Sequence, residues 1–304
     1  MFVKCNYLNG YDYQFKNLPE RVNRELYYLG YSKLGILDKE ALQAFKNDTQ
    51  TIKGEIEKWN SKGQLFSLID TYRQLFIRSN QIVHDHFCKY LQPFFSSDEV
   101  DIHAASHIVK PFGLRSKFLC HQDSAIVEEP QAFALNAWMP LTDVGLLNGC
   151  LWVLPGSHIL PNYTRYAGNN PFDGKQTQKE LWKKLKPVYF KAGEVILFHR
   201  SLLHGSSKNF IPGYRIAVEA IVIPKNAQLI VSHRDEDTPK EKILMFKVDK
   251  DHFFVNDNPR GKLLKDMKNF ETKDWQSNSY ALDTLQQYYP LFEQRAAAIK
   301  VKHV

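Results

Sequence analysis

Cysteine, long apolar runs and clustered charge are all scarce in this 304-residue chain. The four cysteines, Cys5, Cys88, Cys120 and Cys150, include no pair at CxxC spacing, which argues against a zinc ribbon or a dithiol redox motif and indicates reduced thiols. No apolar run approaches the ~18 residues of a transmembrane helix. Residues 1–15 lack the continuous apolar segment of a signal peptide. We therefore expect a cytoplasmic protein.

The net charge of +7 raises the question of an anionic partner. Nucleic-acid-binding proteins usually cluster Lys and Arg, whereas the densest short stretch here is Lys183, Lys184 and Lys186. The sequence also lacks a convincing basic amphipathic helix of the kind that lies on a membrane. We therefore expect neither a nucleic-acid nor a membrane partner. A solvated basic surface is the first interpretation of the charge, and an anionic small-molecule substrate or cosubstrate is the second.

Hydrophobic periodicity divides the chain into three regions, which we expect to form one domain over 1–304. The region to about residue 97 has helical periodicity. Residues 101–224 contain short apolar runs separated by Gly, Pro and Asn. Residues 225–304 are mixed and charged. Short strands broken by turns are typical of an antiparallel sandwich or jelly roll, so we predict an all-β core with flanking helices, an α+β chain.

Local patterns place individual helices. Asp38 directly precedes a run with helical spacing and predicts an N-cap. The run from Leu65 to Leu91 predicts a long helix that packs on the core without carrying chemistry. Residues 282–299 predict a helix that docks on the sheet and is interrupted by Pro290.

The core region also contains one clear strand and one long connection. Residues 133–140 alternate, with Phe133, Leu135, Ala137 and Met139 on one face and Ala134, Asn136 and Trp138 on the other. Residues 160–185 are long for a connection in a compact domain, which favours a functional lid or a small helical insert. The charged stretch 232–242 is a second candidate for the lid.

A His-x-Asp motif is the main chemical signal. Side chains at i and i+2 of a strand project from the same face, so His121 and Asp123 can bind one metal ion together. Alone, this short motif is weak, because an ordinary strand residue bonded to a loop gives the same spacing. A second histidine from a distant strand would complete a facial triad. Such a triad leaves positions open for a bidentate keto acid and O₂ and is the arrangement of non-haem Fe(II) oxygenases.

Two histidines in the segment FHRSLLHGSSKN are candidates for the third ligand. His199 and His204 point to opposite faces of a regular strand, and His204, which Gly205 follows at the end of an apolar run, is favoured. Arg215 opens the next strand and suits the distal carboxylate of a keto diacid, which guanidinium binds in bidentate fashion. Ser206 adds a hydroxyl. An arginine at a strand start more often forms a surface salt bridge, but the position of Arg215 after the distal histidine favours the cosubstrate role.

Several blocks in this order resemble the phytanoyl-CoA dioxygenase family of Fe(II)/2-oxoglutarate oxygenases. They are HQD at 121–123, NAWMPLTDV and NGCLWVLPGSH within 136–158, GEVILFHRSLLHGSSKN at 193–209, and Arg215. GYSKLGILDKEAL at 30–42 also resembles the family's N-terminal strand and helix. The resemblance covers about residues 28–225, and the middle block is its most distinctive part.

The resemblance implies a double-stranded β-helix, the cupin-like jelly roll, that uses Fe(II), 2-oxoglutarate and O₂. It implies iron ligands at His121, Asp123 and His204, and cosubstrate contacts from Arg215, Ser206, Trp138 and Asn136. The family's further cosubstrate-binding lysine has no secure counterpart, and Lys110 is a candidate. Because Asp123 is present, the expected outcome is hydroxylation of a small acidic substrate, such as an amino acid or a natural-product or carrier-bound acid. His158 is expected to cap a turn near the pocket.

Three other functions compete with this interpretation. A cupin-like isomerase or sugar-binding protein has the same fold but no need for an arginine that binds 2-oxoglutarate. A catalytically inactive jelly roll would serve protein interaction, against which the complete triad argues. A nucleic-acid demethylase has the same chemistry, but the chain lacks its clustered basic stripe.

Overall fold

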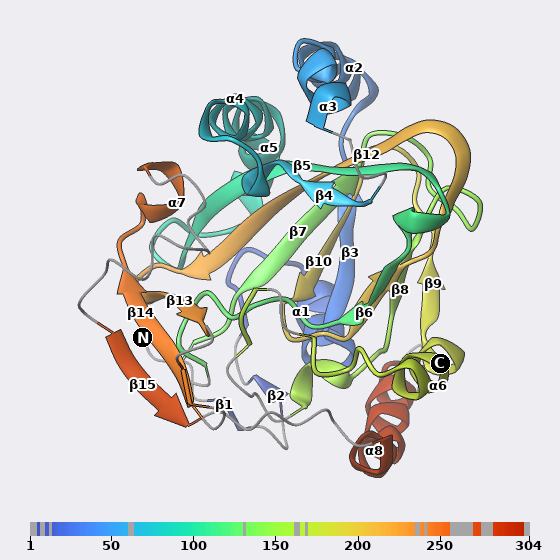
Figure 1. Cartoon of the computed structure of the whole chain (residues 1–304), viewed down its shortest axis with the longest axis vertical. Coiled ribbons are helices and arrows are strands. Elements are labelled where there is room, and N and C mark those ends of the chain that lie inside the picture. Colours follow the sequence, from blue (N-terminus) through green and yellow to red (C-terminus); the bar gives the residue numbers. More distant parts are fainter. Residues whose placement is uncertain are drawn as a thin grey trace.

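Two antiparallel sheets form the centre of the molecule in the computed structural model (Figure 1). The larger sheet contains, in spatial order, β3 (Tyr31–Ile36), β10 (Glu194–His199), β7 (Leu135–Pro140), β12 (Asn209–Pro224), β5 (Val100–Gly113) and β4 (Phe66–Ser67). The smaller sheet contains β6 (Phe118–His121), β11 (His204–Ser206), β8 (Leu151–Val153) and β9 (Lys186–Val188). The structure describes residues 5–6, 10–11, 14–59, 64–129, 132–160, 165–167, 170–234, 238–239, 242–255, 270–274 and 282–300. This architecture is a jelly roll with flanking helices, as predicted.

The alternation predicted for residues 133–140 decides how the larger sheet is buried. Leu135, Ala137 and Met139 of β7 belong to the cluster beneath the helices. Trp138 instead belongs to a cluster with Leu151 of β8, in the space between the two sheets. Both faces of β7 are therefore covered, and every residue of the strand is buried. The prediction is confirmed.

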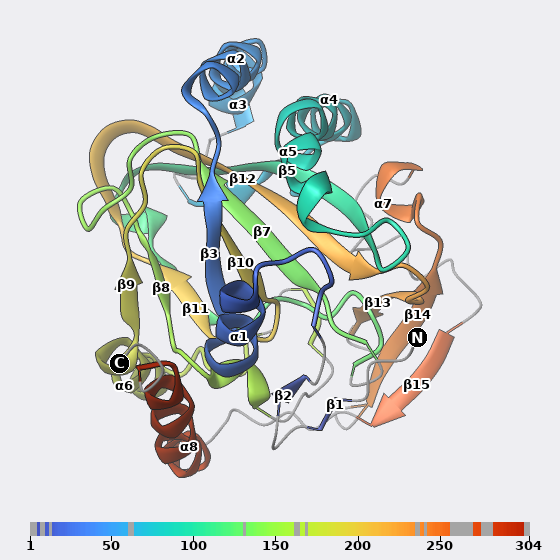
Figure 2. The same ribbon diagram turned by 180° about the vertical axis from the view of Figure 1, so that it is seen from behind.

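Helices from the N-terminal region cover the outer face of the larger sheet, and Figure 2 shows α1 in front of β3 and β10. They are α1 (Glu20–Leu29), α2 (Lys39–Gln50), α3 (Lys53–Trp59), α4 (Arg73–Val83) and α5 (Lys89–Leu91), with a π-helical turn (His84–Cys88) between the last two. The predicted N-cap is confirmed, because the Asp38 carboxylate accepts a hydrogen bond from the Ala41 amide at 2.9 Å.

The long helix predicted from Leu65 is wrong at its start. Phe66 and Ser67 form β4, which pairs with Val109 and Ile108 of β5, and α4 begins only at Arg73. The edge of β5 overrides the helical periodicity of this segment, because pairing with β5 gives hydrogen-bond partners to buried backbone N–H and C=O groups. This correction matters, because β4 lies at the wall of the main cavity.

Elements from the C-terminal half close the two ends of the jelly roll (Figure 1). At one end lie β13 (Leu229–His233), β14 (Lys242–Val248), β15 (Phe270–Asp274) and α7 (His252–Val255). At the other lie α6 (Lys175–Lys184), within the insert predicted at 160–185, and α8 (Leu282–Lys300). A two-stranded ribbon, β1 (Cys5–Asn6) and β2 (Gly10–Tyr11), completes the described elements. Among the described helices, none is long and apolar enough to cross a bilayer.

The C-terminal helix docks on the smaller sheet, as predicted. Leu285 and Phe292 are buried with Cys120 of β6. The interruption expected at Pro290 is absent, since α8 continues through this residue. Packing on both sides of the proline holds the two halves of the helix in one element despite the missing backbone donor.

Candidate metal centre

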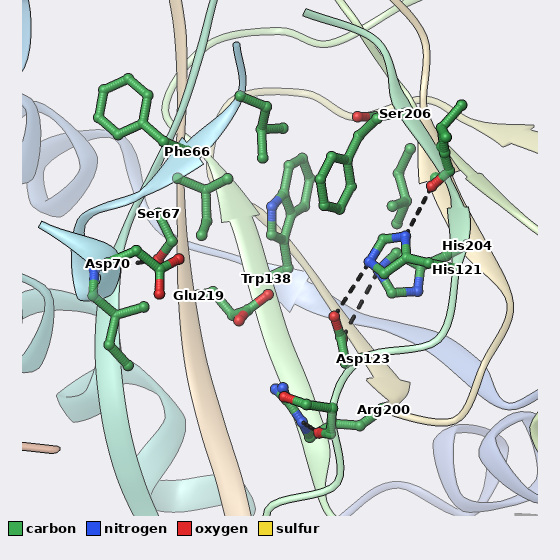
Figure 3. A pocket seen from close by; sticks show the side chains of 18 of the residues that line it. Phe66, Ser67, Asp70, His121, Asp123, Trp138, Arg200, His204, Ser206 and Glu219 are labelled. Atoms are coloured by element: carbon green, nitrogen blue, oxygen red, sulfur yellow. Dashed lines mark hydrogen bonds and ion pairs between the residues drawn. The ribbon is translucent and has the colours of Figure 1, made fainter. Parts of the chain in front are cut away.

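Two neighbouring strands of the smaller sheet bring three ligand side chains together. His121 at the end of β6 is the register partner of His204 on β11, and Asp123 follows two residues after His121. One ligand atom from each side chain lies within 4.8 Å of the others. The Asp123 carboxylate lies 3.4 Å from Nε2 of His121 and 3.8 Å from Nε2 of His204 (Figure 3). The structure therefore brings together the three residues that the sequence proposed as ligands.

The tautomer of both histidines suits metal binding. Nδ1 of His121 lies 2.9 Å from the Leu119 carbonyl, and Nδ1 of His204 lies 3.0 Å from the Leu202 carbonyl. A carbonyl only accepts, so each Nδ1 carries the proton and each Nε2 presents a lone pair toward Asp123. Burial lowers the pKa of His204 to about 4, and the neighbouring His121 adds to the shift. This donor set of two neutral imidazoles and one carboxylate fits Fe(II).

A hydrogen-bonded chain orients the Asp123 carboxylate. Asn136 donates from Nδ2 to Oδ2 of Asp123 at 2.6 Å, and Arg200 donates to the amide oxygen of Asn136. The Asp123 amide also donates to the Arg200 carbonyl at 2.9 Å. Burial favours the neutral acid, but the neighbouring His204, Arg200 and His121 outweigh it and hold the pKa of Asp123 well below its usual range. The carboxylate is therefore ionised, as a metal ligand requires.

The triad opens into a cavity of about 840 Å³ between the two sheets. Arg215, Ser206 and Trp138 line this cavity together with the three ligands. Arg215 is 4% exposed, its guanidinium lies 5.4 Å from the centre of the Trp138 ring, and its Nε has no hydrogen-bond partner among the described residues. A buried guanidinium with an unused donor costs free energy unless an anion binds there. The site therefore fits a carboxylate, such as the distal end of 2-oxoglutarate.

Two other residues considered for the cosubstrate face elsewhere. The Asn136 amide is occupied by Asp123 and Arg200, and Asn136 does not line the described cavity. Lys110 is fully buried, and its Nζ donates to the carbonyls of Ser116 and Ser207, the latter at 2.9 Å. Burial and the charge of Arg215 lower the pKa of Lys110 to about 6. Lys110 thus ties two loops together behind the cavity.

The remaining histidines of these segments lie outside the cavity. His199 stacks on His158 with ring centres 4.8 Å apart, and burial lowers the pKa of His199 to about 3. Nε2 of His158 bonds the Tyr27 carbonyl at 3.1 Å. This stacked pair supports the connection between α1 and the turn at 157–159. It provides no ligand to the triad.

Several cavity residues carried no recognisable signal in the sequence. Arg200 is one of them, because only the fold places it beneath Asn136. Ser67, Asp70 and Glu219 lie across the cavity from the triad (Figure 3). Arg115 and Lys117 line the cavity and are exposed, so they mark its rim. These residues come from segments far apart in the chain, and local spacing gives no sign of their proximity.

A jelly roll with a His-x-Asp motif and a distal histidine at its cavity has the facial-triad architecture of non-haem Fe(II) oxygenases. The sequence profile of the phytanoyl-CoA dioxygenase (PhyH) family matches residues 35–217, which is more than half of the chain. The chain therefore belongs to the phytanoyl-CoA dioxygenase family.

Curated relatives agree with this assignment. Phytanoyl-CoA dioxygenase 1 of Oryza sativa subsp. japonica is 30% identical over 120 residues, which cover 38% of this chain and 42% of the relative. The peroxisomal phytanoyl-CoA dioxygenase of Homo sapiens is 34% identical over 110 residues, which cover 34% and 32% of the two chains. The chain thus spans about two fifths or less of the length of these relatives.

Solved structures share the fold. The α-ketoglutarate-dependent carbocyclase SnoK from nogalamycin biosynthesis aligns with a TM-score of 0.52 at 20% identity, covering 70% of this chain and 87% of that one. EctD from S. alaskensis, solved with 2-oxoglutarate and 5-hydroxyectoine, aligns with a TM-score of 0.51 at 18% identity, covering 75% and 84%. At these identities the likeness concerns the fold alone.

Proposed function

We propose that this chain is an Fe(II)- and 2-oxoglutarate-dependent dioxygenase that hydroxylates an unactivated C–H bond of a small acidic substrate and releases succinate and CO₂. The observation that carries the proposal is the shared cavity, in which the triad lies together with Arg215, whose Nε has no hydrogen-bond partner among the described residues. An iron ligand set alone fits several cupin-like proteins. An anion site beside it is what a keto diacid cosubstrate requires.

Each residue of the site has a defined role in this proposal. His121, Asp123 and His204 hold Fe(II), which with 2-oxoglutarate and O₂ supplies the oxidising chemistry. Arg215 and Ser206 bind the distal carboxylate of 2-oxoglutarate, and Trp138 forms the wall beside Arg215. Asn136 holds the Asp123 carboxylate in orientation and is a positioning residue.

The rim and far wall of the cavity support a substrate that carries an acid group. Arg115 and Lys117 at the rim attract an anion. Asp70 and Glu219 on the wall opposite the triad suit the amino group of an amino acid better than a purely anionic chain. An amino acid is therefore the first substrate class to test, and natural-product or carrier-bound acids are the second.

We also infer that residues 1–304 act as one catalytic domain. The C-terminal helix supports this inference, because Arg295 of α8 donates to the Tyr27 carbonyl of α1, and Leu285 and Phe292 pack against Cys120 of β6.

Succinate formation tests the proposal. The anaerobically Fe(II)-loaded protein would receive 2-oxoglutarate and air, with and without a panel of amino acids, acyl-CoAs and small acids. We expect succinate to rise with one member of the panel and to disappear in Asp123→Ala. Absence of succinate with every panel member, despite bound iron, contradicts the proposal.

Arg215 separates the oxygenase from a cupin-like isomerase or binding protein. Arg215→Met is expected to raise the KM for 2-oxoglutarate about tenfold or more, because it removes a charge-assisted contact. Arg295→Met is the matched control, since Arg295 is 7% exposed and lies at α8, away from the cavity. Unchanged activity in Arg215→Met would favour the isomerase or binding function.

A further inference from the structure

Three adjacent turns at one edge of the jelly roll expose large apolar side chains. We name this group the apolar rim, and it consists of Phe112, Leu114, Leu146, Leu147, Phe210 and Ile211, which are 48–70% exposed. The turns are adjacent, because Asn209 pairs with Gly113, and the Phe210 amide donates to the Leu147 carbonyl at 2.7 Å. They lie where β5 ends and β12 begins, at the upper right of Figure 1. Single exposed apolar residues are ordinary, but a group of them on adjacent turns is typical of an interaction surface.

The charges on the same turns have one sign. The segments 112–119, 145–149 and 207–214 contain Arg115, Lys117 and Lys208 and no Asp or Glu. Asp143 lies just before the second turn, and its carboxylate is engaged by Lys191 at 2.9 Å. Apolar side chains flanked by bases suit a surface that is apolar beneath and anionic at its boundary.

The rim continues into the entrance of the cavity. Phe118 and Leu119 are 40% and 42% exposed, follow directly from the first turn and line the cavity beside His121. A surface bound at the rim would therefore lie next to the opening through which substrate reaches the triad.

We propose that the apolar rim docks this protein on an anionic lipid surface, with the cavity entrance beside the bilayer. The expectation of no membrane partner depended on the missing basic amphipathic helix, and three separate turns provide the same combination of groups without one. A second copy of the chain fits less well, because a twofold contact would place the bases of one rim against those of the other.

Vesicle flotation of the full chain tests the proposal without depending on its catalytic activity. The probes are vesicles of phosphatidylcholine alone and of phosphatidylcholine mixed with phosphatidylserine. We expect binding to the mixed vesicles that weakens as salt rises, because the headgroup attraction is screened. Leu147→Ser and Phe210→Ser are each expected to lower the partition coefficient about tenfold or more. Arg115→Gln and Lys208→Gln are each expected to lower it about fivefold.

Two matched controls distinguish the rim from general surface effects. Phe270 on β15 is 47% exposed, close to the 51% of Phe210, and lies at the opposite end of the molecule, so Phe270→Ser should leave binding unchanged. Lys89→Gln on α5 should likewise leave it unchanged.

No binding to either vesicle, equal binding to both, or equal loss in Phe210→Ser and Phe270→Ser would each overturn the proposal. If the protein does not bind vesicles but self-associates in a way that Phe210→Ser abolishes, the proposal is overturned in favour of a contact between copies. If it does not bind vesicles but captures an acidic protein, the proposal is overturned in favour of a protein partner.

Discussion

Replacing Asn136 by Leu should weaken metal binding although Asn136 is not a ligand. Its side-chain amide donates to the Asp123 carboxylate at 2.6 Å and accepts from Arg200, so it connects a ligand to a buried cation. Leu keeps a similar volume in the fully buried position but makes neither bond. Asp123 then loses its orientation relative to His121 and His204.

The size of the effect follows from the two hydrogen bonds that are lost. A hydrogen bond to a charged group contributes about 1.5–3 kcal/mol, and loss of a partner of this kind typically weakens metal binding about 10–100-fold. That range corresponds to about 1.4–2.7 kcal/mol of binding free energy. Arg200 also loses a buried acceptor, which lowers the free energy of unfolding by about 1–3 kcal/mol.

Anaerobic calorimetric titration with Fe(II) or Co(II) measures the first quantity, and urea unfolding of the metal-free protein measures the second. Asn23→Leu is the control, because Asn23 is also buried and accepts from the Phe15 amide at 2.9 Å, but it has no contact with the triad. We expect both variants to be less stable and only Asn136→Leu to bind metal more weakly. Wild-type metal affinity in Asn136→Leu, or equal weakening in both variants, would refute the reasoning.

Three further predictions concern stability. Gly149 has φ of 81°, and a Cβ there would lie 2.9 Å from the Ser207 carbonyl oxygen, whereas Gly213 has φ of 93° and open space around it. Thermal unfolding should therefore show a larger loss of stability for Gly149→Ala, about 1–3 kcal/mol, than for Gly213→Ala. Asp38→Ala removes the N-cap of α2 and should cost about 1 kcal/mol in urea unfolding; a change near zero would contradict the cap assignment. Burial lowers the pKa of His107 from 6.5 to about 3, so below pH 6.5 the unfolded chain takes up a proton that the folded chain refuses. The free energy of unfolding is therefore unaffected by this proton above pH 6.5 and falls by up to about 1.4 kcal/mol per pH unit as the pH drops toward 3. His107→Gln should reduce this slope when unfolding is measured across the range.

The sequence anticipated the candidate ligands because their geometry is local or at a strand end. His121 and Asp123 share one strand face by alternation alone, and Gly205 beside His204 marks a place with room for a ligand. The distance between the two histidines in space depends on the pairing of β6 with β11, which no local pattern contains. The hydrogen bond between Asn136 and Arg200 could not be anticipated for the same reason, since the two residues lie 64 positions apart.

Local pattern also failed where a neighbouring strand changed the outcome. Helical periodicity extended to Leu65, but Phe66 and Ser67 pair with the edge of β5 as β4 and therefore lie at the cavity. The predicted lid segments 160–185 and 232–242 lie partly outside the described residues, and α6 is the described helix within the first of them.

By itself, the sequence determined the jelly-roll class, the faces of the central strand and the residue types able to bind iron and a keto diacid. Periodicity and capping depend on neighbours a few residues apart, so these features can be predicted from the sequence. Only the tertiary structure decided which residues surround the cavity, how Asp123 is oriented and where the apolar rim forms. Those features arise from long-range strand pairing, which brings together side chains such as Arg115, Leu147 and Phe210 that have no relation in sequence.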